Sequence, residues 1–384
     1  PKTPILYDLL TVDEHIDFIG NAYRIKNYQE IAQKYLELFK IIEKRKSIAK
    51  ELSKGMTQKL SMLLALLIQP KALLVDEPMV GLDPGSIEDV LNIFKQLKKE
   101  GYEIEAVRNR GYRLLESPDI MSEAEIRSLM DTEWAGKNIV YFDEIDSTNN
   151  RAKELGEKDG AHGTLFVADR QVAGKGRRGR VWESPKGISI YMTILLRPDL
   201  IPTKAPMLTL VMAQSVAEGI REVTGMETGI KWPNDIVMNK KKVCGILTEM
   251  STEIDYINYV VIGVGINVNQ KVFDEELKEK ATSLMIETGA PVKRSALIAA
   301  VMKHFEINYA LFMENGDLSG LQESYNEMLV NRGKEVRILE PGNEYNAHAY
   351  GINETGELIV RTQKGEEKHI FAGEVSVRGI YGYV

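Results

Sequence analysis

Cysteine is almost absent from this chain of 384 residues, and histidine is scarce. The single cysteine, Cys244, excludes any disulfide within the chain. The five histidines show no spacing typical of metal ligands, and they are His15, His162, His304, His348 and His369. This pattern argues against a structural or catalytic zinc.

Long apolar runs are also missing. No run reaches the roughly 18 to 20 residues that a membrane span needs, and the sequence does not open with a signal-peptide pattern, so we expect a cytoplasmic protein without a membrane span. The composition, 43% hydrophobic and 27% charged, is typical of a soluble globular protein and excludes a mainly disordered one. A net charge of -7 argues against a chain-wide nucleic-acid surface and leaves a local basic patch open. The length predicts two or three domains at about 100 to 200 residues each.

The first hundred residues carry three ordered signals. The chain begins at Pro1 without an initiator methionine, as though in mid-domain, and shows helical periodicity from Thr11 to Lys50. Leu52–Met56 then opens an apolar helix, and Ala72–Val75 is typical of a buried strand. The strand ends in a carboxylate pair, and a turn at Gly81–Pro84 follows.

These signals resemble the signature motif, the Walker B strand and the following turn of an ABC-transporter ATPase. The resemblance implies that Ser53 and Gly55 present backbone amides to a phosphate at a helix N-terminus. It also implies that Asp76 holds magnesium through water and that Glu77 polarises the attacking water. The Walker A phosphate loop and the downstream histidine are absent, so we expect no ATP hydrolysis by this segment alone. Two alternatives stay open. The signature motif could act in trans on the ATP of a complete ATPase partner, or the whole protein could be an ABC-transporter ATP-binding subunit.

The segment that follows predicts a helix at Ile87–Lys99 and a β-hairpin around Asn109–Gly111. The hairpin resembles the wing of a winged helix-turn-helix. The helices expected before a wing, including the one that reads DNA, are replaced by the ATPase-like sequence, which makes specific operator binding doubtful. Arg108, Arg110 and Arg113 are expected either to contact phosphates or to form a solvated face.

A new pattern begins at Met121. Ser122 and Glu125 form a capping box for a helix to about Trp134, and Pro118 and Asp119 mark the preceding linker. A strand is predicted next. This strand is expected at Asn138–Ile145, and a helix is expected at Asn150–Gly156. The short polar side chains of Asp146–Asn149 stand between them, an arrangement that is typical of ordinary helix caps.

The strand predicted at Thr164–Gln171 leads to a basic glycine loop, Gly174–Arg180, with three glycines and four cations in seven residues. Glycines let the backbone approach a ligand, and the cations attract an anion. Phosphate binding, a nucleic-acid contact and a plain solvated loop are the alternatives for this loop alone.

Further strands and a helix follow, with two more motifs between them. Strand Ser189–Pro198 and helix Ala205–Val223 precede Lys231–Asp235, and Lys242–Glu249 follows a turn at Asn239–Lys241. Strand Val260–Asn269 contains glycines, which weaken a strand unless something must approach its backbone. A flat bicyclic ligand is such a group.

These motifs, in this order, resemble the biotin protein ligase catalytic domain from Asn138 to about Val330, and the hairpin points to its repressor-type subgroup. The family implies an α/β fold with a mixed sheet and a small SH3-like barrel after it. The barrel fits the short alternating runs Glu335–Leu339, Glu357–Thr362 and Glu374–Arg378. We therefore expect an ABC-like segment at 1–100, a wing remnant and linker at 101–118, the catalytic domain at 119–330 and the barrel at 331–384.

The resemblance implies ATP-dependent formation of biotinyl-5'-AMP and transfer of biotin to a lysine of a biotin carboxyl carrier protein domain, with ATP, Mg2+ and biotin required. Lys242 is expected to offset charge at the biotin carboxylate and the α-phosphate, Arg177 to clamp the adenylate, and Asp235 to assist the acceptor lysine. The residues expected to bind biotin are Ser147, Thr148, Asn149, Gln171, Gly174, Gly176, Arg177, Gly245, Gly263 and Gly265. Those expected to bind ATP or the adenylate are Lys175, Arg177, Arg178, Trp182, Asn234, Lys242, Asn267 and Arg378.

Two residues depart from the family pattern. The family often has arginine where Lys175 stands, and lysine keeps the charge while losing bidentate geometry. Cys244 is expected to be a small buried hydrophobe rather than a reactive thiol. A biotin-responsive repressor and a lipoate-type ligase stay open as alternative functions, and so does a homodimer.

Overall fold

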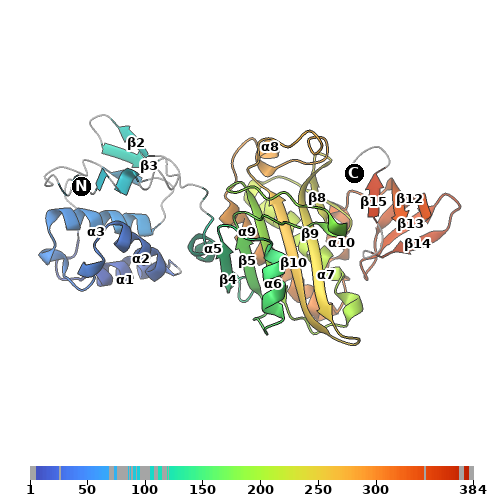
Figure 1. The fold of residues 1–384 in the computed structure, drawn as a ribbon, viewed down its shortest axis with the longest axis horizontal. Helices are drawn as coiled ribbons and strands as arrows, with labels where there is room; N and C mark the ends of the chain where they lie inside the picture. Colours follow the sequence, from blue (N-terminus) through green and yellow to red (C-terminus); the bar gives the residue numbers. More distant parts are fainter. Residues whose placement is uncertain are drawn as a thin grey trace. The chain divides into compact units, whose positions relative to one another are not determined.

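The structure is a computed structural model that describes residues 6–25, 27–68, 73–75, 85, 87, 90–91, 93–95, 104–107, 111–114, 119, 121–340, 343–371 and 376–379. Only the backbone is described for 73–75, 104–107, 111–114, 340, 343 and 376–379. The chain divides into two compact units, Pro1–Ser128 and Leu129–Val384 (Figure 1). We call them the front unit and the ligase unit. Asp76, Glu77, the turn at 81–84, Arg108 and Arg110 lie outside the described residues.

Helices with one apolar side build the front unit: α1 (Val12–Ala22), α2 (Tyr28–Leu38) and α3 (Lys54–Leu67), with short 3-10 turns η1 (Ile42–Lys44) and η2 (Ala49–Glu51). Thr11 and Glu14 form a capping box at α1, and the Ser53 hydroxyl accepts from the Met56 amide at the start of α3. The buried faces of these helices share one core with Val90, Ile93 and Phe94, which follow in the chain. The segment that resembles an ATPase therefore has a packed core of its own.

The front unit also contains a three-stranded antiparallel sheet in the order β1-β3-β2, made of β1 (Leu73–Val75), β2 (Ile104–Val107) and β3 (Gly111–Leu114). Strands β2 and β3 form the predicted hairpin. Strand β1, predicted from the ATPase-like sequence, pairs with β3 of that hairpin, with Leu73 opposite Leu114. The two dissimilar stretches of sequence thus contribute to one sheet.

The ligase unit is built on a seven-stranded mixed sheet in the order β4-β5-β6-β10-β9-β8-β7. Its strands are β4 (Ile139–Phe142), β5 (Thr164–Ala168), β6 (Ser189–Leu196), β7 (Gly229–Lys231), β8 (Asp235–Met238), β9 (Lys241–Thr252) and β10 (Ile257–Asn267). Strands β4 and β5 are parallel, and every other described pair is antiparallel. Asn239 and Lys240 both have positive φ, as the two central residues of a tight hairpin turn require. The predicted mixed sheet is confirmed.

Alternation along β9 and β10 decides what lies on each face of the sheet. Val261 packs with Ala152 of α6 (Thr148–Gly156), whereas Thr248 contacts Thr209 of α7 (Met207–Thr224). Helix α7 packs in turn on α9 (Arg294–Asn315) (Figure 1). The odd-numbered residues of both strands therefore face α6, and this face carries Gly245, Gly263 and Gly265.

Helix α9 is long and apolar enough by composition to cross a membrane, but 56% of its apolar stretch is buried inside the unit, as in the core helices of soluble proteins. The shorter helices of the ligase unit are η3 (Arg177–Gly179), η4 (Pro202–Lys204), α8 (Leu284–Thr288) and α10 (Gln322–Met328), and α5 (Glu123–Leu129) stands at the end of the front unit in the chain. Helix α5 begins at the predicted cap, because the Glu125 amide donates to Ser122 Oγ, but it ends well before Trp134.

A small antiparallel sheet follows in the order β14-β13-β12-β11-β15, and it is the SH3-like domain predicted from the sequence. Its strands are β11 (Lys334–Glu340), β12 (Asn343–Ile352), β13 (Leu358–Thr362), β14 (Glu367–Ile370) and β15 (Ser376–Gly379). Trp232, 1% exposed, joins it to the larger sheet: its backbone N–H donates to Asn331 Oδ1 and its indole N–H to the Gly356 carbonyl. Trp232 thus has a structural role.

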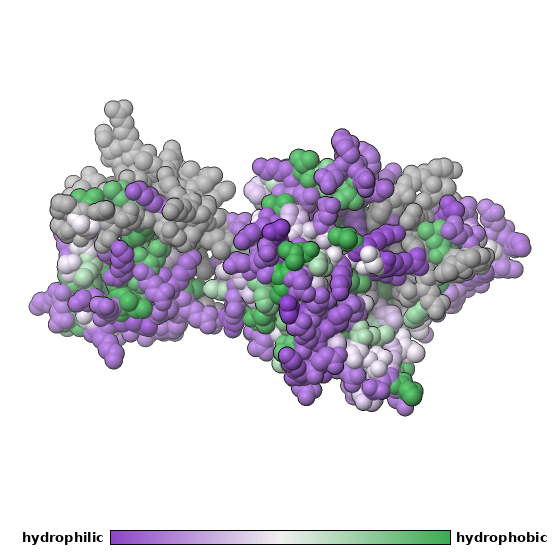
Figure 2. All heavy atoms as spheres, in the orientation of Figure 1, coloured by the Kyte–Doolittle hydropathy of each residue, from purple (hydrophilic) through white to green (hydrophobic). Residues whose placement is uncertain are grey.

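Figure 2 shows one face of the molecule, which is mainly hydrophilic with small separate apolar clusters. A surface of this kind is ordinary for a soluble globular protein.

Candidate active site

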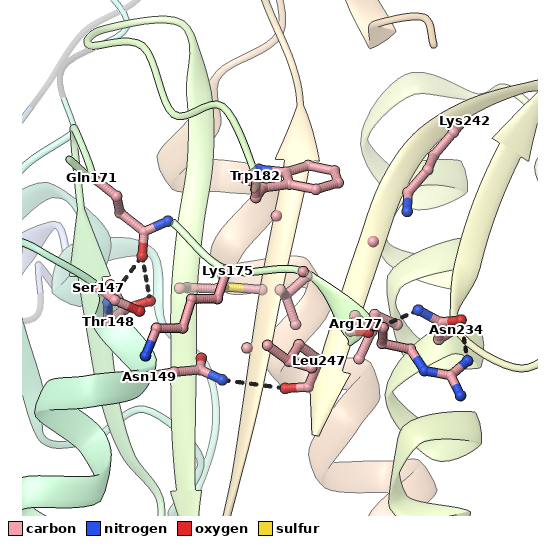
Figure 3. Close-up of a pocket in the computed structure, with 17 residues that line it drawn as sticks. Ser147, Thr148, Asn149, Gln171, Lys175, Arg177, Trp182, Asn234, Lys242 and Leu247 are labelled. Carbon is pink, nitrogen blue, oxygen red and sulfur yellow. Dashed lines mark hydrogen bonds between the residues drawn. The ribbon is translucent and has the colours of Figure 1, made fainter. Parts of the chain in front are cut away.

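A cavity of about 460 Å³ opens between α6, the basic glycine loop and strands β9 and β10 (Figure 3). The residues that line it are Ser147, Thr148, Asn149, Gln171, Lys175, Gly176, Arg177, Trp182, Met192, Asn234, Lys242, Gly245, Ile246, Leu247, Gly263, Val264 and Gly265. The sequence motifs, far apart in the chain, thus meet around one space.

One wall of the cavity is uncharged and polar, and it comes from the start of α6. Ser147 stands at the N-cap, yet its side chain makes no capping hydrogen bond, and Thr148 and Asn149 belong to the first turn of the helix. All three are at most 5% exposed. The Gln171 Oε1 atom accepts from both the backbone N–H and the hydroxyl of Thr148, at 2.9 and 3.1 Å (Figure 3). Ser147 is therefore not an ordinary side-chain cap, and all three residues line the cavity, as the resemblance implies.

The opposite wall carries positive charge from the basic glycine loop. The loop is a small hairpin, because Trp182 N–H donates to the Gly174 carbonyl and Gly176 N–H to the Arg180 carbonyl. From it Arg177 reaches across the cavity and donates to Asn234 Oδ1 at 3.0 Å. Burial lowers the pKa of Arg177, and the nearby charge of Asp235 opposes this shift. A guanidinium nevertheless stays protonated in proteins, so Arg177 is a fixed positive charge beside the cavity.

Lys242 stands between a carboxylate and an aromatic ring. Its Nζ atom lies 2.6 Å from Asp235 Oδ1 and 5.2 Å from the centre of the Trp182 ring. Strand pairing explains the ion pair, since a register shift at Ile236 brings residue 235 of β8 opposite Gly245 and residue 237 opposite Lys242. The ammonium is 77% buried with its partner close by, so a ligand anion could replace that partner without creating a new charge.

The glycines of β9 and β10 do make room, but for side chains of the protein. Gly245 and Gly265 lie opposite each other in the sheet, and a Cβ atom at Gly265 would come within 2.5 Å of the Trp182 ring. A Cβ at Gly263 would come within 2.1 Å of Asn149 Oδ1. The glycines therefore let Trp182 and Asn149 lie directly on the sheet, where they form part of the cavity wall.

Several expected site residues do not line this cavity. Gly174 lies on the far side of the loop, where a Cβ would meet the Trp182 carbonyl within 2.4 Å. Arg178 is exposed at the loop tip with a φ of 59°, and Asn267 is buried and donates to the Thr282 carbonyl. Asp235 does not line the cavity, but it pairs with Lys242, which does. Arg378 lies in β15, but its side chain is outside the described part of the chain.

Two partners of the cavity residues were not predicted. Thr193 of β6 is completely buried and lies 2.6 Å from Asn149 Oδ1, and Glu249 of β9 accepts from Asn149 Nδ2 at 2.8 Å. The available signal is alternation, because Glu249 lies on the same face of β9 as Gly245 and Leu247.

Cys244 is completely buried, and burial raises the pKa of its thiol. Its alternation with Gly245 turns it toward the other face of the sheet. The expected role of a small hydrophobe is supported, because a thiol held protonated is a poor nucleophile.

A second cavity of about 660 Å³ shares Arg177, Asn234 and Ile246 with the first. Its remaining lining residues are Ala205, Pro206, Thr209, Pro233, Thr248 and Met250. Together the two cavities give a polar pocket and a wider, mostly apolar space on either side of one arginine.

Comparisons with known proteins agree with this geometry. Residues 141–267 match the Biotin/lipoate A/B protein ligase family, and residues 333–378 match the Biotin protein ligase C terminal domain. The bifunctional ligase/repressor BirA of Bacillus spizizenii is 43% identical over 287 residues, which is 74% of this chain and 87% of that protein. The chain belongs to the biotin protein ligase family. This biotin protein ligase is also 28% identical to BirA of Escherichia coli over 283 residues, covering 73% of this chain and 86% of that one.

Solved structures give the same result for the ligase unit. The biotin protein ligase from Aquifex aeolicus in complex with biotin and ATP is 34% identical, with a TM-score of 0.56, and covers 63% of this chain and 99% of its own. Residues 2–80 match a different family, ABC transporter, as the signature and Walker B motifs indicated.

Proposed function

We propose that this protein activates biotin with ATP and transfers it to a protein lysine. In the first step a biotin carboxylate oxygen attacks the α-phosphorus of ATP, and the bond from that phosphorus to the bridging oxygen breaks, which releases pyrophosphate. In the second step the lysine amine attacks the acyl carbon of biotinyl-5'-AMP, AMP leaves, and the nitrogen loses a proton. The observation that carries the proposal is the single cavity in which an uncharged polar wall faces Lys242 and Arg177.

The polar wall suits the ring of biotin. A buried ureido group needs paired donors and acceptors, and the side chains of Ser147, Thr148, Asn149 and Gln171 provide both kinds. Hydrogen bonds hold Thr148, Asn149 and Gln171 in place before a ligand arrives. This preorganisation reduces the entropy cost of binding.

Lys242 and Arg177 suit the reacting end. Two anions, the carboxylate and the α-phosphate, must approach each other, and fixed cations lower the cost of that approach. We assign to Lys242 the stabilisation of the negative charge that develops at the α-phosphorus. Its ammonium leaves Asp235 and contacts the ligand instead. We assign Arg177 to a clamp that retains the adenylate, because it already bridges from the basic glycine loop to Asn234.

The nucleotide extends from Lys242 toward the second cavity. Trp182 offers a flat ring, and its buried indole N–H has no hydrogen-bond partner among the described residues. Mg2+ prefers oxygen ligands and is usually held by one or two carboxylates together with phosphates. Asp235 and the amide oxygen of Asn234 fit such a partial set, and magnesium bound there would offset phosphate charge.

Asp235 is also the carboxylate best placed to assist the acceptor. Once Lys242 turns to the ligand, the Asp235 oxygen 2.6 Å from Nζ becomes available to take a proton from the incoming lysine. Relatives named biotin--[acetyl-CoA-carboxylase] ligase, in Mycobacterium tuberculosis and Paracoccus denitrificans, support a carboxyl carrier domain as the acceptor class.

The test is biotin-dependent exchange of labelled pyrophosphate into ATP by the full chain, with magnesium. Exchange with biotin and none with lipoate supports the proposal. Exchange with lipoate alone would assign the lipoate-type activity, and ATP hydrolysis without biotin would favour the ATPase alternative. Absence of exchange with biotin would refute the ligase function.

A further inference from the structure

A charged pair stands directly behind the polar wall. Glu249 does not line the cavity, yet its Oε2 accepts from Asn149 Nδ2 at 2.8 Å and its Oε1 accepts from Lys153 Nζ at 2.7 Å. Lys153 belongs to α6 and Glu249 to β9, so the pair also joins this helix to the sheet. Both side chains are about one-third exposed or less, at 32% and 28%.

Glu249 is the stronger of two acceptors that decide which way the Asn149 amide points, because the Leu247 carbonyl also accepts from Asn149 Nδ2, at 3.4 Å (Figure 3). Burial would raise the pKa of Glu249, but hydrogen bonds from Lys153 and Asn149 outweigh burial, and its pKa lies below the ordinary value. Glu249 is then ionised at neutral pH and can only accept hydrogen bonds. The amide nitrogen of Asn149 must face the carboxylate, so its oxygen lies over Gly263 and beside Thr193.

The amide oxygen in turn sets the direction of a short chain of hydroxyl groups. Thr193 Oγ1 lies 2.6 Å from Asn149 Oδ1 and 2.8 Å from Thr148 Oγ1, but it has one proton. Because Asn149 Oδ1 can only accept, the Thr193 proton belongs in that contact. The Thr148 proton then belongs between the two hydroxyls, since two oxygens at 2.8 Å repel without one.

Gln171 Oε1 is the weaker of the two acceptors within reach of the Thr148 proton. It lies 3.1 Å from Thr148 Oγ1, the longest of the three oxygen contacts, and it also accepts the Thr148 backbone N–H at 2.9 Å. Thr148 and Asn149 therefore keep oxygen lone pairs available on the cavity side.

We propose that Glu249 is a positioning residue that determines specificity: by fixing the Asn149 amide it makes this wall accept hydrogen bonds, and so selects a ligand that carries ring N–H donors. The ureido ring of biotin has two such donors, whereas the dithiolane ring of lipoate has none. The inference rests on the proposed biotin ligase function and names the origin of its selectivity.

Glu249→Gln tests this role with little change in shape. A glutamine can accept from Asn149 or donate to it, so only the longer contact to the Leu247 carbonyl still favours the original orientation, and the Asn149 nitrogen can turn toward Thr193 and the cavity. We expect the Kd for biotin to rise roughly tenfold to a hundredfold, the range for losing a hydrogen bond to a charged group. We expect the KM for ATP to stay within about twofold, because ATP presents no group to this wall.

Two further variants separate positioning from the ion pair. Lys153→Met removes the ion pair and leaves the Glu249–Asn149 bond, so the Kd for biotin should stay within about threefold, because the bond that orients the Asn149 amide remains and water partly screens a pair that is about one-third exposed. Glu154→Gln, on the same helix with its ion pair to Arg151 in solvent, is the matched control and should change nothing. Glu249→Gln alone leaves the charge of Lys153 without its partner. The double variant Lys153→Met with Glu249→Gln removes both charges, and it should lose as much biotin affinity as Glu249→Gln alone.

The ratio of the Kd values for two related ligands separates the two roles, because a merely structural role would leave this ratio unchanged. The unaltered protein should bind biotin far better than biotin methylated on a ureido nitrogen, and Glu249→Gln should narrow that ratio. If Glu249→Gln weakens biotin and ATP alike, or if Lys153→Met reproduces its effect, the role is structural and the proposal is overturned. If the unaltered protein binds biotin and Glu249→Gln binds it equally well, only this inference fails. If the unaltered protein binds no biotin, the proposed function fails with it.

Discussion

Both units of this chain have a packed hydrophobic core, but they differ in what surrounds their motifs. In the ligase unit, residues from several distant segments line one cavity. In the front unit, the signature residue Ser53 caps α3, and its hydroxyl is occupied by the Met56 amide. A motif that forms a stable local structure is therefore insufficient for a function, because a site also needs partners from elsewhere in the chain. The following predictions test whether ligase activity depends only on the ligase unit, and whether the stability of each unit can be changed without changing the other.

Lys242→Ala should produce the largest effect. Removing one preorganised charge at a reacting centre typically costs about 100-fold to 1,000-fold in rate, so biotin-dependent pyrophosphate exchange should fall by that factor. Lys241→Ala is the matched control, because this neighbour donates to the Lys278 carbonyl at the surface and does not line the cavity. A near-normal exchange rate in Lys242→Ala would refute its assigned role.

Arg177→Ala should affect retention more than formation of the adenylate. Without the contact to Asn234 the loop loses its link across the cavity, so preformed biotinyl-5'-AMP should escape roughly tenfold to a hundredfold faster. A chase with unlabelled biotin measures this rate, and Arg180→Ala at the exposed end of the same loop is the control. An unchanged escape rate would mean that the clamp lies elsewhere.

The order of the secondary structure was predictable because periodicity and turn residues are local signals. Helix α7 was expected at 205–223 and is found at Met207–Thr224, and strand β10 starts three residues before its expected start. In the SH3-like domain, β12 and β14 were missed. Their polar, charged sequences lack clear alternation, and pairing with neighbouring strands stabilises them instead.

The sequence predicted which residues line the cavity better than it predicted which side chains contact each other there. The resemblance pointed to Thr148, Asn149 and Lys242, all of which line the cavity. It did not indicate that Gly265 accommodates Trp182, or that Asn267 turns to the Thr282 carbonyl, because both depend on tertiary packing between distant segments. Glu249 was quoted only as the end of a motif, since its role arises from contact with α6.

Ser53→Ala tests the independence of the front unit. Loss of this helix cap should destabilise the front unit by about 1 kcal/mol, which hydrogen exchange of the α3 amides can measure. The ligase unit offers a separate signal, because all three tryptophans of the chain, Trp134, Trp182 and Trp232, belong to it. Tryptophan-detected unfolding and pyrophosphate exchange should not change, and Ser53→Asp should restore the α3 protection. A fall in exchange activity would show that the units are coupled and would break the comparison.

The smallest effect concerns pH and is confined to the ligase unit. His304 lies 3.4 Å from Glu218 and 2.8 Å from Glu222, which also contacts Lys303, while Gln214 and Asn308 donate to Glu218. Hydrogen bonding to Glu218, opposed by burial, raises the pKa of His304. A raised folded pKa means that the stabilisation is complete below the unfolded value of about 6.5 and is lost as pH rises through the folded value. The pKa values of Glu218 and Glu222 are lowered because hydrogen bonds outweigh burial, so their contribution to the free energy of unfolding is lost only as pH falls below about 4.5.

His304→Gln should therefore lower the free energy of unfolding by up to about 1 kcal/mol at pH 6 and by less at pH 9. Tryptophan-detected urea unfolding at the two pH values measures the difference, and a deficit that grows toward pH 9 would contradict the pairing.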